Sequence, residues 1–188
     1  MEQILVVPTE LVRPYVGEKG LFTGREQELY TLVEEKHSFM PRPEAEQDPG
    51  HKQIIPYIIL TRGDEVFATR RTNRGGEQRL HGLIALGLGG HINIDDDDRP
   101  GIFQRGLLRE LSEEAEFDAV GELTPQGVIN DDTTEVGKVH LGFLFTLEVS
   151  RAAVRETEKL EGLWIRRSEL SSHADRMEGW SQIALEIL

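Results

Sequence analysis

Short apolar runs typical of β-strands alternate along this chain with stretches of helical spacing. Two stretches, 26–37 and 177–188, place their apolar residues on one side of a helix. A third does the same through Leu108, Leu111 and Ala115, which we expect to face the core. The pattern therefore predicts helices at these three places.

Seven apolar runs predict strands, and polar turn residues separate them. The run 53–61 is the most apolar, and its Pro56 indicates an edge strand or a bulge. The turn at 62–65 predicts a hairpin, whereas the proline-bearing segment 41–50 predicts a polar loop. The predicted strands are 3–7, 53–61, 65–72, 83–88, 128–130, 140–149 and 162–166.

Strands before and after one central helix, followed by a terminal helix, are typical of an α/β (α+β) fold with helices on a mixed sheet. The 188 residues suffice for one domain with a sizeable core. We expect residues 1–50 to form an N-terminal strand–helix extension packed on a core domain of residues 51–188. This extension could also mediate a homodimer.

Composition removes several classes of function. The chain has no cysteine, which excludes disulfides, thiolate metal sites and a cysteine nucleophile. Its net charge of −13 argues against binding a nucleic acid polymer through a basic surface. No apolar run reaches the roughly 20 residues that span a bilayer, and the first residues lack the pattern of a signal peptide. We therefore expect a cytoplasmic location and no membrane partner.

Three carboxylates lie close together on the predicted central helix. Glu110, Glu113 and Glu114 are related as i, i+3 and i+4 and so share one face. Like charges at this spacing destabilise a helix unless a cation lies between them. A hard divalent metal ion prefers such oxygen ligands. A solvated acidic face is the alternative interpretation, and the residues around the cluster decide between the two.

Upstream of this cluster lies the glycine run 87–90, and Arg109 directly precedes Glu110. The chain here resembles the Nudix hydrolases, whose signature is Gly, five residues, Glu, seven residues, then Arg-Glu-U-x-Glu-Glu-x-Gly-U, where U is aliphatic. Gly90 matches the first glycine and residues 109–114 match the central run. Residues around 89–93 also look similar to a divergent, MutT-like subgroup of predicted phosphoesterases.

Two features depart from the Nudix pattern. Glu116 occupies the place of the last glycine, and the interval from Gly90 to Arg109 is about five residues longer than the pattern. The isolated glutamate of the signature would fall on Gly101, and any of the nearby aspartates 95–98 could take its place. We expect these aspartates to form a solvated loop that favours the start of the helix.

The resemblance implies a Nudix-type α/β/α sandwich and a metal-dependent hydrolase. It assigns Mg²⁺ or Mn²⁺ as the cofactor, with Glu110, Glu113 and Glu114 as its ligands. It also assigns catalytic roles to Glu113, Glu114 and Arg109, and we expect the arginine to hold one of these glutamates in position. The lack of cysteine argues against the isoprenoid isomerases, which share this fold.

Other residues are candidates for substrate binding. Gly89 and Gly90 allow close approach of a ligand or a helix, or simply mark a strand end. Several arginines could bind phosphates or could be solvated, while histidines beside the motifs could be structural. A further carboxylate could come from outside the helix, at Glu135, Glu158 or Glu161. The substrate candidates are Arg70, Arg71, Arg79, Gly89, Gly90, His91 and Glu135, and Arg74 and His140 lie close to them in the sequence.

Two functions remain open at this stage. The first is a hydrolase that cleaves the phosphoanhydride bond of a nucleoside diphosphate linked to another moiety. The second is a Nudix-like module that binds a nucleotide or metabolite without hydrolysing it. The intact glutamates favour the enzyme, because a pure binding module need not keep a metal cluster, whereas the longer spacing and Glu116 weaken that preference.

Overall fold

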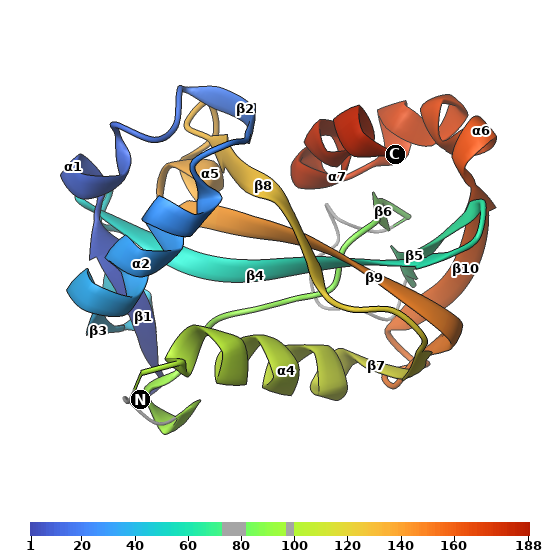
Figure 1. Ribbon diagram of the computed structural model, residues 1–188, viewed down its shortest axis with the longest axis horizontal. Coiled ribbons are helices and arrows are strands. Elements are labelled where there is room, and N and C mark those ends of the chain that lie inside the picture. The colour runs from blue at the N-terminus through green and yellow to red at the C-terminus, as the bar shows by residue number, and fades with distance from the viewer. Residues whose placement is uncertain (73–81, 97–99) are drawn as a thin grey trace. The chain divides into compact units, whose positions relative to one another are not determined.

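The computed structural model describes residues 1–72, 82–96 and 100–188 (Figure 1). Its strands are β1 (Gln3–Pro8), β2 (Lys19–Phe22), β3 (Ser38–Pro41), β4 (His51–Arg62), β5 (Glu65–Arg71), β6 (Ile84–Ala85), β7 (Ala115–Ala119), β8 (Thr124–Asp131), β9 (His140–Val154) and β10 (Leu160–Arg166). Its helices are α1 (Thr9–Val12), α2 (Glu26–Lys36), α3 (Arg42–Ala45), α4 (Ile102–Glu114), α5 (Glu135–Lys138), α6 (Arg167–Leu170) and α7 (Gly179–Ala184). Short 3-10 turns lie at Ile94–Asp96, Ser171–Arg176 and Leu185–Ile187. These elements form a mixed α/β fold with a mixed sheet, as the sequence predicts.

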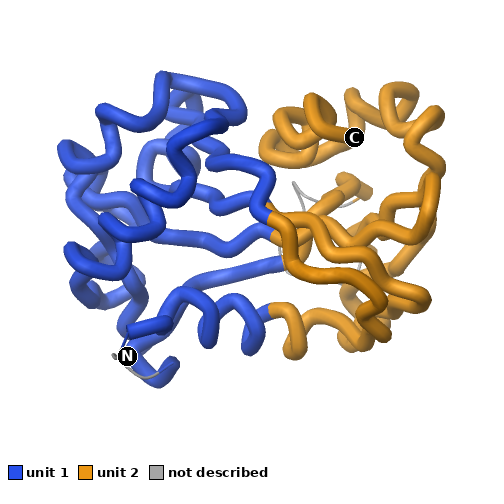
Figure 2. Tube along the Cα trace, viewed as in Figure 1, with its two compact units in different colours: residues 1–57, 89–110, 125–144 blue, residues 58–88, 111–124, 145–188 orange. Residues whose placement is uncertain are grey.

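The chain divides into two compact units (Figure 2). The first comprises residues 1–57, 89–110 and 125–144, and the second comprises residues 58–88, 111–124 and 145–188. Strands β4 and β9 and helix α4 each contribute residues to both units. Each unit is described by itself below.

In the first unit, β1 lies between β3 and β4. It pairs antiparallel with both strands, and β2 pairs antiparallel with β8. Most of β1 and β4 is buried, because both consist largely of β-branched and other apolar residues. The segment 1–50 thus contributes strands to this sheet, and its treatment as a separate extension of a 51–188 domain stays a prediction.

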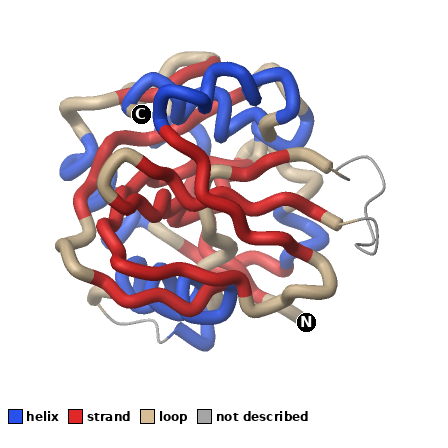
Figure 3. The backbone as a smooth tube through the Cα atoms, turned by 90° about the vertical axis from the view of Figure 1, so that its right-hand side faces the viewer, coloured by secondary structure: helices blue, strands red, loops and turns tan. Residues whose placement is uncertain are grey.

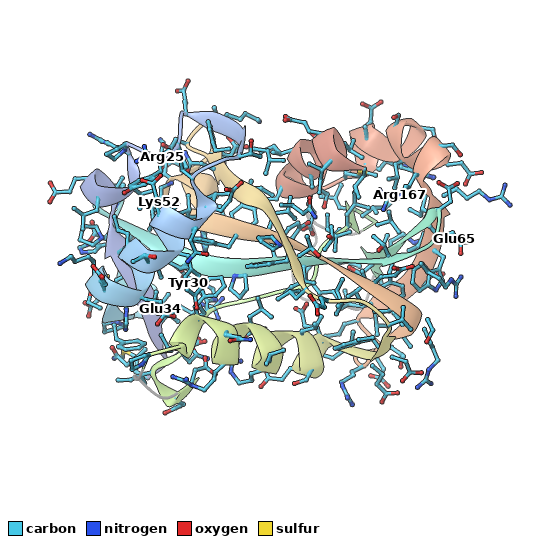
Figure 4. All side chains as sticks on the ribbon, viewed as in Figure 1. Arg25, Tyr30, Glu34, Lys52, Glu65 and Arg167 are labelled. Carbon is cyan, nitrogen blue, oxygen red and sulfur yellow. The ribbon has the colours of Figure 1, made fainter. Side chains whose placement is uncertain are left out.

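A buried lysine fixes the connection between β8 and β9. The Lys52 side chain is 1% exposed, and its Nζ donates to Asp132 Oδ1 at 2.5 Å and to the Gly137 carbonyl at 2.8 Å (Figure 4). It also donates to the carbonyl of His140 at 3.2 Å. Burial lowers the pKa of Lys52, and the nearby Asp132 carboxylate opposes that shift. The ammonium therefore has three acceptors and holds this connection in one conformation.

In the second unit, β5 pairs antiparallel with β10 and with the short β6, and β7 pairs antiparallel with β9. Figure 3 faces this unit and shows the C-terminal helices above its strands. The hydroxyl of Ser181, on α7, accepts from the backbone N–H of Leu86 at 2.9 Å. The hairpin predicted at 62–65 is present, with Gly63 at a φ of +55°.

Several predictions about single elements are wrong. Leu108 is 54% exposed, so its place in the predicted apolar stripe is wrong; Leu111 is buried as predicted, and Leu107 is buried as well. Ala115 is buried but begins β7, because the helix ends at Glu114. The segment predicted as a loop at 41–50 contains α3, where a proline suits the first turn.

One of the two alternatives predicted for Pro56 is also wrong. Strand β4 lies between β5 and β9, so Pro56 is not on an edge strand, and a bulge there stays a prediction. Among the described residues, every helix is too short or too polar to cross a membrane.

Candidate active site

Glu110, on α4, lies against the backbone of Gly90. A Cβ atom added to Gly90 would overlap the Glu110 carboxylate, including Oε2, so any other residue at position 90 would displace that group. The Glu110 side chain is 13% exposed, so its carboxylate sits in a largely desolvated place. Gly90, which the sequence predicts to allow close approach, therefore lies against one carboxylate of the predicted metal cluster.

Arg109 connects three parts of the chain around this carboxylate. Its Nη1 donates to Glu110 Oε1 at 2.6 Å, and its Nη2 donates to the carbonyl of His91 at 2.8 Å. Its Nε and Nη2 also form a bidentate pair with Asp96, at 2.6 and 2.8 Å. These hydrogen bonds, led by those to Asp96, raise the pKa of Arg109, so the guanidinium stays charged. Arg109 therefore holds Glu110 in position, as the sequence predicts.

Asp96 is the aspartate that the structure places beside Arg109, a choice that the sequence left open among residues 95–98. Its side chain is 4% exposed, and Oδ2 also accepts from the backbone N–H of Asn93 at 2.8 Å. The expectation of a solvated aspartate loop is thus wrong for Asp96, while Asp95 is exposed and 97–98 lie outside the described residues. A signal was available, because counting six residues forward from Gly90 reaches Asp96. The additional residues of this chain therefore fall between Asp96 and Arg109.

Gly106 lets α4 pack closely on the residues before it. A Cβ atom there would lie 2.9 Å from the side chain of Ile92 and 3.1 Å from Asp96 Oδ2. The separation from Ile92 is shorter than real Cβ contacts, and the one from Asp96 is tighter than most, so a side chain at position 106 would force these neighbours to shift. The close packing explains a glycine inside a helix, where it otherwise costs about 1 kcal/mol against alanine.

Gly89 is required for a different reason. Its φ of +152° is rarely adopted by residues with a side chain, and a Cβ atom would overlap the carbonyl oxygen of Pro56. The backbone of residues 89–91 thereby runs close along β4. Gly89 is thus needed for this backbone path, and its part in substrate binding stays a prediction, while Gly90 is the glycine that contacts Glu110.

His91 is a largely buried neighbour of this cluster. Its Nε2 lies 2.8 Å from Gln53 Oε1, and its ring centroid lies 5.6 Å from that of His140. Desolvation lowers the pKa of His91 to about 4, and nearby Arg42 and His140 contribute to the shift. Desolvation also lowers the pKa of His140, whose Nδ1 contacts the carbonyl of Val136 at 2.7 Å. His91 is therefore neutral near pH 7.

This neutral histidine predicts a loss of stability in weak acid. In the unfolded chain His91 takes up a proton near pH 6.5, whereas in the folded chain it does so only near pH 4. The unfolded state binds more protons between these values, so its free energy falls relative to that of the folded state. Because of His91, we expect the free energy of unfolding at pH 5 to be about 2 kcal/mol lower than at pH 7.5.

Urea unfolding of the wild type and of His91→Gln at both pH values measures this effect. The variant has no titrating group at position 91 and should lose correspondingly less stability over the same interval. Equal losses in the two proteins would contradict the assignment of the effect to His91.

The other two glutamates follow Glu110 along α4. Glu113 is exposed and Glu114 is partly exposed, one turn beyond Glu110 on the same helix. Within the described residues, no three acidic or histidine side chains converge closely enough to hold a metal ion. The helix thus presents three carboxylates on one face, and their service as metal ligands stays a prediction.

Comparisons with known proteins identify the family of this chain. No family model matches the chain. A curated protein, YmaB of Bacillus subtilis, is 36% identical over 100% of this chain and 97% of its own length. The crystal structure of Tm1382, a proposed Nudix hydrolase, is also 36% identical and superposes with a TM-score of 0.88 over 99% of this chain and 97% of its own. The chain belongs to the Nudix superfamily. The MutT Nudix hydrolase of Burkholderia pseudomallei, at 18% identity and a TM-score of 0.51 over 72% of this chain and 96% of its own, shares the fold.

The remaining candidates of this Nudix protein have other partners where the structure describes them. Arg70 pairs with Glu161 at 2.6 Å, and the Nε of Arg71 lies 3.8 Å from Glu178. Glu135 is exposed on α5 and pairs with Lys138 at 2.6 Å. Arg74 and Arg79 fall outside the described residues, and Glu158 is exposed. Substrate binding by these residues stays a prediction.

The contact between Gly90 and Glu110 predicts a selective loss of activity in Gly90→Ala. The new methyl group meets the end of a side chain, so we expect a stability loss of only about 1 kcal/mol. The displaced carboxylate should lower kcat/KM by about 100-fold, since a shift of about 1 Å can have that effect. Thermal unfolding and steady-state kinetics measure the two quantities.

Gly63→Ala provides a control for strain alone. Gly63 has a φ of +55° with nothing within 4 Å of an added Cβ, so alanine there is strained without displacing a neighbour. This variant should lose stability and keep its activity. Equal activities for Gly90→Ala and Gly63→Ala would argue against a role for the Glu110 position.

Proposed function

We propose that this Nudix protein is a divalent-metal-dependent hydrolase that cleaves the phosphoanhydride bond of a nucleoside diphosphate linked to another moiety. Membership of the superfamily supports hydrolase activity in general. The observation that carries the proposal is the position of Glu110. Its carboxylate lies against Gly90, and Arg109 donates a hydrogen bond to it. A solvated acidic helix face would need neither the buried Asp96–Arg109 pair nor a glycine opposite one carboxylate.

The donor set suits Mg²⁺ or Mn²⁺. Both ions bind carboxylate oxygens, and magnesium needs only a few of them because it keeps several waters. In this proposal Glu110, Glu113 and Glu114 would hold the ion, which supplies charge neutralisation on the phosphoryl oxygens and an activated water. Arg109 keeps the Glu110 carboxylate oriented, while Glu113 and Glu114 serve as the catalytic carboxylates.

Small phosphorylated molecules are the proposed substrates. A bound metal ion would reverse the local charge in this acidic chain, which otherwise repels polyanions. We assign substrate contacts to Arg70, Arg71, Arg79, His91 and Glu135. Arg70 and Arg71 would have to exchange carboxylate partners for phosphate oxygens, because each has a glutamate nearby.

A second candidate is a binding module that takes up a nucleotide or metabolite without cleaving it. One observation favours it: among the described residues, no acidic cluster is already arranged around a metal position. In such a module Gly90 and Arg109 would shape a ligand site without turnover.

Phosphate-product release separates these functions. Nucleotides, dinucleotides and nucleoside diphosphate sugars would be incubated with wild type and with Glu114→Gln, in Mg²⁺, in Mn²⁺ and in a chelator. Metal-dependent release that the variant lacks supports the hydrolase. Thermal shifts with a ligand but no product from any compound would support the binding module.

A further inference from the structure

Glu34, on α2, binds the first backbone amides at the start of α4. Its Oε2 accepts from the N–H of Gly101 at 2.8 Å, and its Oε1 accepts from the N–H of Phe103 at 3.2 Å. Gly101 directly precedes the first residue of the helix. Figure 4 labels Glu34 and Tyr30 on the side of α2 that faces α4. One carboxylate from a distant part of the chain therefore caps the helix that carries the predicted metal ligands.

This cap is reinforced by neighbouring side chains. The ring of Tyr30 packs edge-on against Phe103, with centroids 5.3 Å apart. Burial raises the pKa of Tyr30, and the charge of Glu34 and a hydrogen bond to it add to that shift. Phe103 also packs against Phe143, with centroids 5.0 Å apart. The start of α4 is thus held by both polar and aromatic contacts.

Helix starts need such partners because their first N–H groups have no acceptor within the helix. The partner is usually the side chain of the residue just before the helix. Here that position is Gly101, which has no side chain, so the acceptor comes from α2. A negative carboxylate at this end also interacts favourably with the helix dipole.

The cap lies at the point where this chain departs from the Nudix spacing. The additional residues fall between Asp96 and Arg109, and Gly101 belongs to that interval. Contacts on α4 then fix it at three levels: Glu34 at its start, Gly106 against Ile92, and Arg109 on Asp96.

We propose that Glu34 is a positioning residue for α4, and that through the helix it sets the place of Glu110 against Gly90. This inference rests on the proposed function, since it gives the N-terminal segment a part in holding the metal-binding helix. Removal of a direct hydrogen-bond partner of a metal ligand weakens metal affinity by about 10- to 100-fold, and Glu34 acts one step further away, so we expect an effect at the lower end of that range. Glu34 touches neither metal nor substrate in this account and acts only through α4.

The test compares Glu34→Ala, Glu34→Gln and Glu34→Asp with Glu35→Ala. Glu35 is the adjacent, exposed glutamate of α2, so its replacement removes the same charge without removing the cap. Two quantities would be measured: the rate of amide hydrogen exchange at residues 101–105, and Mn²⁺ affinity by electron paramagnetic resonance. Exchange reports on the helix start whether or not the protein is an enzyme.

We expect Glu34→Ala to exchange faster at 101–105 and to bind Mn²⁺ about tenfold more weakly. Glu34→Gln and Glu34→Asp keep an acceptor, so they should recover part of the protection from exchange and part of the Mn²⁺ affinity. Glu35→Ala should match wild type in both quantities. Wild-type exchange and Mn²⁺ affinity in Glu34→Ala would overturn the inference. If wild type itself binds no Mn²⁺ while Glu34→Ala exchanges faster, the proposed function fails and the metal part of the inference fails with it, although the cap itself is then demonstrated.

Discussion

Glu114→Gln is expected to lose most of its turnover while it keeps its fold. The replacement preserves size and helix propensity but removes the charge that would bind a metal ion or accept a proton. A positioned acid or base typically contributes about 10²- to 10⁴-fold to a rate, so kcat should fall within that range. Steady-state kinetics on the active compound from the substrate panel, beside circular dichroism, measure turnover and fold together.

Glu116→Gln is the matched control for this variant. Glu116 is exposed just after α4, where the Nudix pattern has glycine, and it pairs with Arg155 at 3.2 Å. Its neutralisation should leave kcat unchanged within about twofold, because exposed ion pairs contribute little. Similar kcat values for wild type and Glu114→Gln would remove Glu114 from the catalytic assignment.

Asp96→Asn should produce the largest loss of stability among the substitutions considered. It leaves the Arg109 guanidinium without its buried bidentate partner, and breaking a buried pair costs about 3–5 kcal/mol. Arg109 is 28% exposed, so water compensates in part, and we expect a loss of about 2–4 kcal/mol. Activity should fall as well, because the released arginine no longer fixes Glu110.

Asp95→Asn distinguishes this effect from a general loss of negative charge. Asp95 is the exposed neighbour of Asp96, so its replacement should change the free energy of unfolding by less than about 0.5 kcal/mol. Urea denaturation of both variants measures the difference. Equal stabilities would mean that the Asp96–Arg109 pair does not hold the site, and the account of Arg109 as a positioning residue would then be wrong.

The sequence predicts local features of this site well. Helical spacing places Glu110, Glu113 and Glu114 on one face, because the period of an α-helix is fixed by its backbone. The hairpin at 62–65 follows from local turn chemistry. The strand β4 follows from its apolar content. The match of residues 109–114 to the Nudix signature is also local, and the structural comparison confirms the family.

Other features depend on contacts between distant segments, which no local pattern contains. Leu108 fits an apolar stripe by spacing, yet its neighbour Leu107 faces the core, because packing selects the buried side of the helix. Asp96 reads as one of four similar aspartates until the fold places Arg109 beside it. Glu34 gives no sequence signal as a cap, since its acceptor role depends on where α2 lies.

The sequence by itself therefore determined the chemistry that this chain carries, whereas the tertiary structure decided which residues hold that chemistry in place. Residue type and helical period are properties of adjacent positions, so they can be read along the chain. Asp96 lies 13 positions from Arg109, Glu34 lies 69 positions from Phe103, and Gly90 meets Glu110 only in the folded chain. Their identity follows from packing, which depends on the whole chain.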